Sequence, residues 1–183
     1  MSDMQTKLTY ADYMKTPEEE HCELIGGELV MFTTPPTYHQ LVLSILLYKV
    51  GVFVRERDLG RVYPVLTDVV LSDRDVVKPD ILYVSKQRSY ILTRENVRGA
   101  PDLVVEILSP ATADRDRTLK LDLYAKHGVN EYWIVDPDSR TIVVLLRGKN
   151  RFEVSGIYGE DQSFTSPTLD GFSIALKDLF EAN

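Results

Sequence analysis

The chain has 183 residues, of which 44% are hydrophobic and 27% charged, and its formal net charge is −7. This length and composition are typical of one globular domain, so we expect residues 1–183 to fold as a single unit. The excess of acids argues against a protein that coats nucleic acid nonspecifically, because such binding depends on many Lys and Arg contacts with phosphate. It leaves open an enzyme that acts on a phosphate backbone at one site, since a local basic patch can still guide the substrate.

Targeting and redox signals point to the cytoplasm. The N-terminal residues are polar and lack the apolar core of a secretory signal. The most apolar stretch, Leu41 to Val54, is interrupted by Lys49 and Gly51 and is too short to span a bilayer. The single cysteine, Cys22, excludes an internal disulfide and a cysteine-rich zinc site. We therefore expect a cytoplasmic protein that does not enter a membrane.

The N-terminal part predicts two helices with a hairpin between them. A short helix is expected around Tyr10 to Met14, and the Gly26-Gly27 pair between two apolar runs is typical of a tight hairpin turn. Thr37 and Gln40 have the spacing of a capping box. The helix they introduce, from about Tyr38 to Arg57, is apolar nearly all round, so we expect it in the core.

The rest of the chain predicts a sheet and a second long helix. The predicted strand segments are RVYPVLTDVVLS and VVKPDILYVS, which flank the turn Ser72-Asp73-Arg74-Asp75, then DLVVEILS, EYWIVD and TIVVLL. DLVVEILS is nearly continuous apolar and rich in valine, which is typical of a central strand, and EYWIVD is expected to be buried as well. Residues 87–97 are weakly helical, and a helix is expected from about Arg115 to His127, closed by Gly128. A hairpin-like region, RFEVSGIYGED, and a helix at Leu176 to Phe180 follow. The order predicts an α/β domain with a mixed sheet flanked by helices, an N-terminal hairpin and a C-terminal β-hairpin.

Glu106 lies in a strand that otherwise calls for burial on both faces, between Val104 and Leu108. Carboxylates are seldom buried unless they are paired or bound to metal. The alternative is an internal salt bridge to Lys or Arg. Strand alternation places Asp102 on the same side as Glu106, although a position after Pro101 also suits an ordinary strand entry.

Asp80 follows Pro79 at the start of another apolar strand. Taken alone, an acid at this position is most often a turn or edge residue. Paired with Glu106 on a neighbouring strand, it can hold Mg²⁺, a hard cation that prefers oxygen ligands and retains several waters.

Lys120 supplies a positive charge for the same site. On its predicted helix it shares a face with Asp116 and Tyr124 at spacings of four. An exposed lysine on a helix is commonplace. Beside a metal-binding carboxylate pair, however, it can orient or deprotonate an attacking water and stabilise charge on phosphoryl oxygens.

Glu28 and His39 are secondary candidates. Glu28 directly follows the glycine turn, where it either adds a carboxylate to the pocket or faces solvent on the hairpin. His39 lies in the first turn of a predicted helix, and a single histidine there more often packs or hydrogen-bonds than binds metal.

Several blocks of sequence, in order along the chain, carry a family resemblance. They are ELIGGELV, the His39-Gln40 pair, VVKPDILYVS, GAPDLVVEILSPAT, Lys120 with Tyr124, and EYWIVDP. From about Leu8 to Phe180 the chain resembles the Uma-type family of restriction endonucleases in the PD-(D/E)XK nuclease superfamily. The resemblance implies a restriction endonuclease-like core and a Mg²⁺-dependent hydrolase that cuts DNA phosphodiester bonds, with Mn²⁺ as a substitute.

The resemblance also assigns residues. Asp80 and Glu106 would hold the metal with the backbone carbonyl of Ile107, and a lysine would assist the water. The residue two after Glu106 is Leu108 and not lysine, so the family pattern implies that Lys120 replaces it from the following helix. A homodimer is implied as well, because cutting both strands in one event needs two active sites. The alternatives are a catalytically inactive nuclease-fold protein that binds nucleic acid or a protein partner, and a structural or oligomerisation module.

Overall fold

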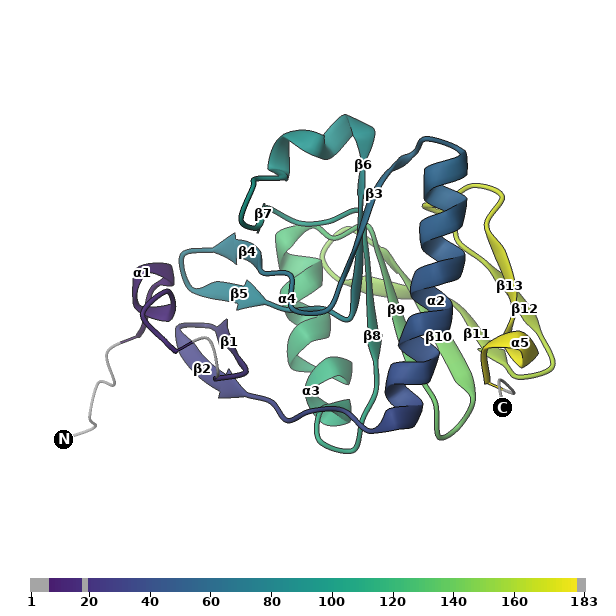
Figure 1. Ribbon diagram of the computed structural model, residues 1–183, viewed down its shortest axis with the longest axis horizontal. Coiled ribbons are helices and arrows are strands. Elements are labelled where there is room, and N and C mark those ends of the chain that lie inside the picture. Colours follow the sequence, from purple (N-terminus) through teal and green to yellow (C-terminus); the bar gives the residue numbers. More distant parts are fainter. Residues whose placement is uncertain (1–6, 18–19, 181–183) are drawn as a thin grey trace.

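Six strands form one mixed sheet at the centre of the protein (Figure 1). The computed structural model describes residues 7–17 and 20–180. In the order β11-β10-β9-β8-β6-β3, β8 and β9 run parallel and the other neighbours are antiparallel. These strands are β3 (Gly60–Pro64), β6 (Ile81–Ser85), β8 (Leu103–Ile107), β9 (Glu131–Asp136), β10 (Thr141–Arg147) and β11 (Phe152–Gly159). The predicted α/β class with a mixed sheet is confirmed.

Successive residues of this sheet enter two separate cores, one on each face. Val105 belongs to the core beneath α2, whereas its neighbour Val104 belongs to the core that contains residues of α4. Figure 1 shows α2 on one side of the sheet and the green helices α3 and α4 on the other. These helices are α2 (Thr37–Glu56), α3 (Ala113–Arg117) and α4 (Leu119–His127). Glu106, two residues after Val104, therefore faces α4.

A second sheet of five strands lies on the α4 side, in the order β2-β1-β5-β4-β7. Its strands are β1 (Cys22–Ile25), β2 (Glu28–Met31), β4 (Val69–Ser72), β5 (Asp75–Val77) and β7 (Val97–Arg98). The segments RVYPVLTDVVLS and VVKPDILYVS each form two strands, and the predicted strand start after Pro79 is confirmed by β6. The first is divided near Leu66, which has a positive φ of 72°, and the second at Pro79, which has no N–H for a ladder. The two halves of each segment join different sheets.

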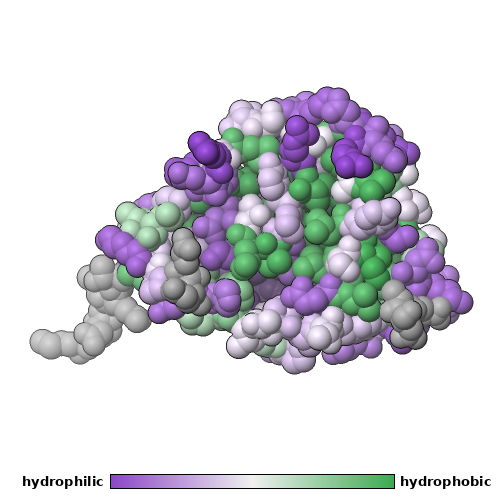
Figure 2. All heavy atoms as spheres, viewed as in Figure 1, coloured by the Kyte–Doolittle hydropathy of each residue, from purple (hydrophilic) through white to green (hydrophobic). Residues whose placement is uncertain are grey.

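The helix α2 covers the six-stranded sheet with one face. Its buried residues are His39, Val42, Leu43, Leu46, Val50 and Val54. Leu41 and Tyr48 are exposed, and Figure 2 shows apolar surface (green) where Figure 1 draws this helix, so the expectation that the helix lies in the core and not on the surface was wrong for its outer face. The capping box was also wrong, since the N-cap is Pro36 and no side chain caps the helix. By length and composition α2 could cross a membrane; its buried stripe packs on the sheet, as in a helix that covers a core.

The second long helix is divided. Residues 113–127 form α3 and α4, separated by Thr118, whose φ of −127° and ψ of −79° are not helical. The predicted single helix from Arg115 to His127 was therefore wrong. The predicted C-cap is confirmed, because Gly128 adopts the left-handed conformation with a φ of 88°. The weakly helical segment forms a 3₁₀ helix, η1 (Lys86–Ile91).

The ends of the described chain follow the sequence closely. The first helix is α1 (Tyr10–Tyr13), and the last elements are β12 (Ser163–Thr165), its antiparallel partner β13 (Ser173–Ala175) and α5 (Leu176–Phe180). The terminal helix confirms the prediction, whereas the C-terminal β-hairpin was predicted at the wrong place, since the pair β12–β13 lies beyond the segment RFEVSGIYGED. The segment RFEVSGIYGED is not a hairpin, because its backbone pairs with β10 as the single strand β11 around one bulge.

The hairpin of β1 and β2 brings one edge of the five-stranded sheet to the central sheet. Its turn is confirmed: Gly26 and Gly27 have φ values of 59° and 79°, a combination that tight hairpins require. Glu23 lies on β1 and is buried. The conformation of the turn therefore helps to position the buried carboxylate of Glu23.

Replacing each glycine of this turn by alanine separates strain from crowding. We expect Gly26→Ala to lower the free energy of unfolding by about 1–2 kcal/mol, because an alanine at positive φ is strained but nothing lies within 4 Å of its Cβ. Gly27→Ala should cost about 1–3 kcal/mol more, since its Cβ would lie 2.8 Å from Cβ of Lys7 and 3.0 Å from the carbonyl oxygen of Leu8. Urea unfolding of the two variants measures the difference. Equal losses would contradict the packing of the turn.

Candidate active site

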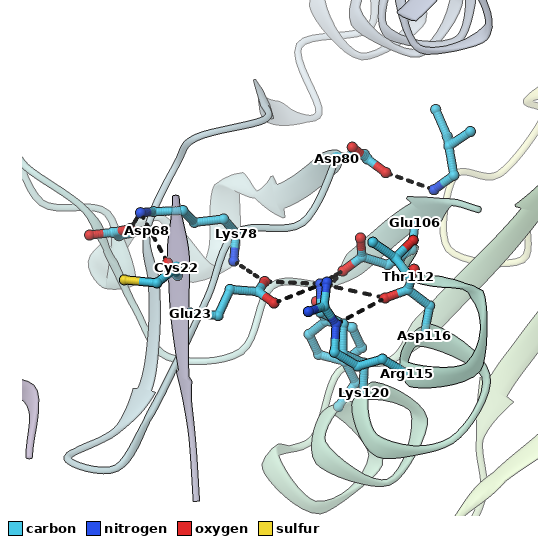
Figure 3. Close-up of polar contacts among 12 residues, drawn as sticks. Cys22, Glu23, Asp68, Lys78, Asp80, Glu106, Thr112, Arg115, Asp116 and Lys120 are labelled. Atoms are coloured by element: carbon cyan, nitrogen blue, oxygen red, sulfur yellow. Dashed lines mark hydrogen bonds and ion pairs between the residues drawn. The ribbon is translucent and has the colours of Figure 1, made fainter. Parts of the chain in front are cut away.

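A pocket opens where the hairpin, α2, β6, β8 and the α3–α4 segment meet. Its cavity volume is about 170 Å³. The walls carry four carboxylates and three Lys or Arg side chains, all of which are labelled in Figure 3. They are Glu23, Asp80, Glu106, Asp116, Lys78, Arg115 and Lys120. Acids and bases that are far apart in the sequence thus converge on one small volume.

Lys120 lies at the centre of this pocket and is almost fully buried. Its ammonium is 2.8 Å from Oε1 of Glu106 and 2.9 Å from Oε1 of Glu23. Asp116, one turn before it, is at 3.7 Å. Tyr124, one turn after it, donates a 2.6 Å hydrogen bond to the same Oε1 of Glu106. The predicted spacing of four along the helix thus brings Asp116, Lys120 and Tyr124 to one carboxylate, despite the break at Thr118.

Asp80 is held at the other wall by the backbone of β8. Its Oδ2 accepts a 2.7 Å hydrogen bond from the N–H of Ile107 and lies 3.3 Å from Nε2 of His39. The antiparallel pairing of Ile81 with Val105 places Asp80, one residue before β6, beside Glu106 and Ile107 at the end of β8. The structure therefore brings together Asp80, Glu106 and Ile107, and it places His39 against Asp80, in line with the packing or hydrogen-bonding role that the sequence favoured over metal binding.

Two other candidates lie elsewhere. Glu28 is exposed on the hairpin and pairs with Lys7, so the solvent-facing alternative describes its position. Asp102 is buried but lies at the opposite end of β8 from Glu106, where it accepts a 2.7 Å hydrogen bond from the N–H of Ser85. The expectation that Asp102 points toward Glu106 was wrong, because alternation fixes the face of a strand but not the position along it.

Glu23 and Arg115 are pocket residues that the sequence reasoning missed, and Asp116 was noted only for its helical spacing. Glu23 had the signal that identified Glu106, a carboxylate within an apolar strand, CELI. The backbone N–H of Lys78 fixes its Oε1 at 2.8 Å. No comparable signal marks Arg115, whose immediate neighbours in sequence, Asp114 and Asp116, are both charged.

Four buried side-chain atoms in the described residues have no hydrogen-bond partner, and all four belong to residues of this pocket. They are Oε2 of Glu23, Nδ1 of His39, Nε of Arg115 and Oδ1 of Asp116. A buried polar group without a partner costs about 1–3 kcal/mol, so such groups are rare unless a ligand uses them. Their concentration in one pocket indicates a site built for a polar or charged occupant.

The buried charges shift one another's protonation. Burial raises the pKa of Glu106 well above its ordinary value, and the charges of Asp116, Asp80 and Glu23 act in the same direction against that of Lys120. Burial also raises the pKa of Asp116. Burial lowers the pKa of Lys120, but the charges of Glu106, Glu23 and Asp116 outweigh it and raise that pKa above its ordinary value. Lys120 therefore stays protonated and cannot accept a proton near neutral pH.

The donor set fits a hard divalent cation. Within residues 7–17 and 20–180, no three or more His, Cys, Asp or Glu side chains form a ready-made metal cage. The described hydrogen bonds to Asp80 and Glu106 all use one oxygen of each carboxylate, Oδ2 and Oε1. The other oxygen of each is left for a ligand. Two carboxylates with few further ligands suit Mg²⁺, which keeps several of its waters.

The protein is an α/β domain in which several acids and a charged lysine are buried against one face of a mixed sheet. A family model described as "Putative restriction endonuclease", that of Uma2, matches residues 9–177. The chain belongs to the Uma2 family, which confirms the resemblance seen in the sequence and indicates a nuclease. A comparison with the curated proteins gives no match.

A solved structure has the same fold. It is the crystal structure of "a putative nuclease belonging to DUF820" from Anabaena variabilis. The TM-score is 0.80 at 24% sequence identity, and the match covers 95% of this chain and 98% of that one. The likeness confirms the predicted nuclease-type fold over nearly the whole chain.

Removing the charge of Lys120 should destabilise the protein in a pH-dependent way. Lys120→Met leaves three buried carboxylates without their cation, so we expect a loss of about 3–5 kcal/mol at pH 8. Carboxyl groups whose folded-state pKa is raised stabilise the fold at low pH, and this stability is lost as pH rises through that pKa. The deficit should therefore shrink toward pH 5. Urea unfolding at both pH values measures it, with Lys126→Met, an exposed lysine on the same helix, as the control. A pH-independent deficit would contradict the account.

Binding of Mn²⁺ should release a proton. The pKa of Glu106 is raised, so below that pKa a cation competes with a proton for this carboxylate, and the affinity should increase by up to about tenfold for each unit by which the pH is raised in that range. Calorimetry in two buffers of different ionisation enthalpy counts the protons. Glu106→Gln mimics the protonated acid and should neither release a proton nor bind the ion tightly. Binding by the wild type that is unaffected by pH would count against Glu106 as a ligand.

Proposed function

We propose that this protein is a Mg²⁺-dependent endonuclease that hydrolyses phosphodiester bonds of DNA. One observation carries the proposal: the pocket concentrates buried acids, a charged lysine and all the unpartnered buried polar side-chain atoms of the described residues. Membership of the Uma2 family supports the same activity. Desolvated charges of this density are costly for stability alone, which favours a functional reason for them.

The chain's own residues divide the work. Asp80, Glu106 and the carbonyl of Ile107 would hold the cation, which supplies a polarised phosphate and an acidified water when bound. The N–H of Ile107 and the imidazole of His39 orient Asp80, and the hydroxyl of Tyr124 orients Glu106. Each carboxylate thus enters the reaction with its direction fixed by a neighbour.

Lys120 acts as a fixed positive charge. Since its pKa is raised, it can orient the attacking water and stabilise negative charge that develops on the phosphoryl oxygens, but it does not remove the proton. The sequence left open whether Lys120 orients or deprotonates the attacking water, and a protonated lysine suits only the first of these roles. Glu23 keeps the ammonium in place when Glu106 is engaged by a cation, because the two acids share Lys120 at nearly equal distances.

Cleavage of plasmid DNA tests the proposal. We expect nicking or linearisation with Mg²⁺ or Mn²⁺, abolished by EDTA and lowered at least about a hundredfold in Asp80→Asn and Glu106→Gln, because each loses a metal-binding charge. Glu28→Gln, which changes an exposed acid outside the pocket, is the control and should cut normally. Cleavage that persists in both pocket variants would contradict the site. Linear product formed without a nicked intermediate would support the homodimer that double-strand cutting requires.

The second candidate is an inactive nuclease-fold protein that binds nucleic acid or a protein partner. It is favoured by the net charge of −7 and by the occupation of Oε1 of Glu106 by Lys120 and Tyr124. Thermal unfolding separates the candidates, because a metal that binds only the folded state raises the melting temperature. No rise at millimolar Mn²⁺ would favour the inactive protein.

A further inference from the structure

The guanidinium of Arg115 is the least satisfied basic group in the pocket. Its side chain is only 15% exposed, and it carries five N–H donors in a rigid fork. Within the described residues it donates no hydrogen bond, and its Nε is one of the buried atoms without a partner. Burying such a group is costly unless a ligand completes its hydrogen bonds.

Two acids lie near Arg115 but accept no hydrogen bond from it. One terminal nitrogen, Nη2, lies 3.8 Å from Oε2 of Glu23, and Nε lies 4.0 Å from Oδ1 of Asp116. Both separations exceed hydrogen-bond length. The two acid oxygens are themselves without a hydrogen-bond partner. Figure 3 shows Arg115 beside Lys120, with ion pairs to both acids. The acids therefore hold the guanidinium by charge while its donors stay available.

A second arginine on α3 has a guanidinium that does form a hydrogen bond. Arg117 donates a 2.6 Å hydrogen bond to Oδ2 of Asp136 and is half exposed. It lies outside the pocket, whereas Arg115 lines it together with Thr112 and Asp80. Two arginines within one short helix thus differ in burial and in hydrogen bonding. Positions two apart on a helix point in different directions, so Arg117 reaches Asp136 near the surface while Arg115 faces the pocket, where a ligand would supply the hydrogen bonds that it lacks.

The chemistry of the fork selects the ligand. The positively charged guanidinium repels a cation, and an apolar group would leave its N–H donors without hydrogen bonds. An oxyanion with two oxygens in one plane accepts two parallel N–H bonds, and a phosphodiester offers two non-bridging oxygens of this kind. We propose that Arg115 binds the non-bridging oxygens of the substrate's phosphodiester and thereby positions it against Asp80 and Glu106. This inference rests on the proposed function, to which it adds the residue that recognises the phosphate.

The most specific test observes Arg115 itself. In a ¹⁵N–¹H spectrum, the Nε–Hε signal of Arg115 is assigned by its loss in Arg115→Lys. We expect this signal to move when inorganic phosphate is added in the presence of Mg²⁺, while the signal of Arg117 stays in place. A stationary Arg115 signal at saturating phosphate overturns the inference. The readout uses the wild-type protein and requires no cleavage.

Binding to DNA under non-cleaving conditions gives the second readout. With Ca²⁺ and a fluorescent oligonucleotide, Arg115→Lys should weaken binding about tenfold or more, because lysine keeps the charge but loses the fork. Arg115→Gln should also lower the slope of log Kd against log salt by about 1, as expected when one phosphate contact is lost. Arg117→Gln is the matched control. Unchanged affinity and slope in both Arg115 variants overturn the inference.

The two proposals fail in different ways. If phosphate moves the Arg115 signal and the Arg115 variants bind DNA weakly, but the wild type never cuts DNA, the phosphate site stands and the endonuclease does not. If the wild type cuts DNA and the Arg115 variants cut and bind as well as it does, the endonuclease stands and Arg115 has no part in recognising phosphate.

Discussion

The buried ammonium of Lys120 is the interaction on which the rest of the site depends. It joins three parts of the fold, because it belongs to α4, contacts Glu106 on the central sheet and contacts Glu23 on the five-stranded sheet. Each of these carboxylates would be strongly destabilising alone in the interior. Together they are tolerable because one cation is shared among them. The position of the N-terminal hairpin against the central sheet is therefore set partly by charge.

Only some of the polar atoms that line the site form hydrogen bonds within the protein. One oxygen of Asp80 and one of Glu106 are fixed by hydrogen bonds from the protein, and the other oxygen of each is left for a ligand. The unpartnered atoms of Glu23, His39, Arg115 and Asp116 surround the same cavity. The protein thus fixes one part of each charged group by hydrogen bonds and leaves other polar atoms without a partner. Binding of a cation and an anion in adjacent positions requires such an arrangement.

The sequence predicted the parts of this site that leave a local signature. Glu106 was identifiable because a carboxylate disturbs a valine-rich strand, and Lys120 with Tyr124 because helical spacing and the family resemblance agreed. The same rule applied to CELI predicts Glu23, which went unnoticed. Arg115 could not be found in this way, since an arginine among charged residues reads as solvated and only the fold reveals its burial. For Asp102 the predicted face of the strand was correct, but the residue lies at the opposite end of the strand from Glu106.

For the fold, turn chemistry was the most reliable guide, as Gly26-Gly27 and Gly128 show. The assignment of strands to sheets could not be predicted, because the apolar segments around Leu66 and Pro79 are each divided between two sheets by packing between residues far apart in the chain.

The central claim is that Asp80 and Glu106 share a divalent metal beside a charged Lys120. Anomalous diffraction from crystals soaked in Mn²⁺ tests it most directly. The account predicts one manganese peak in the pocket, with oxygens of both carboxylates and the carbonyl of Ile107 at about 2.1 Å and Lys120 still in contact with Glu23. A pocket that binds no manganese at saturating concentration, or a peak that touches neither carboxylate, would contradict it.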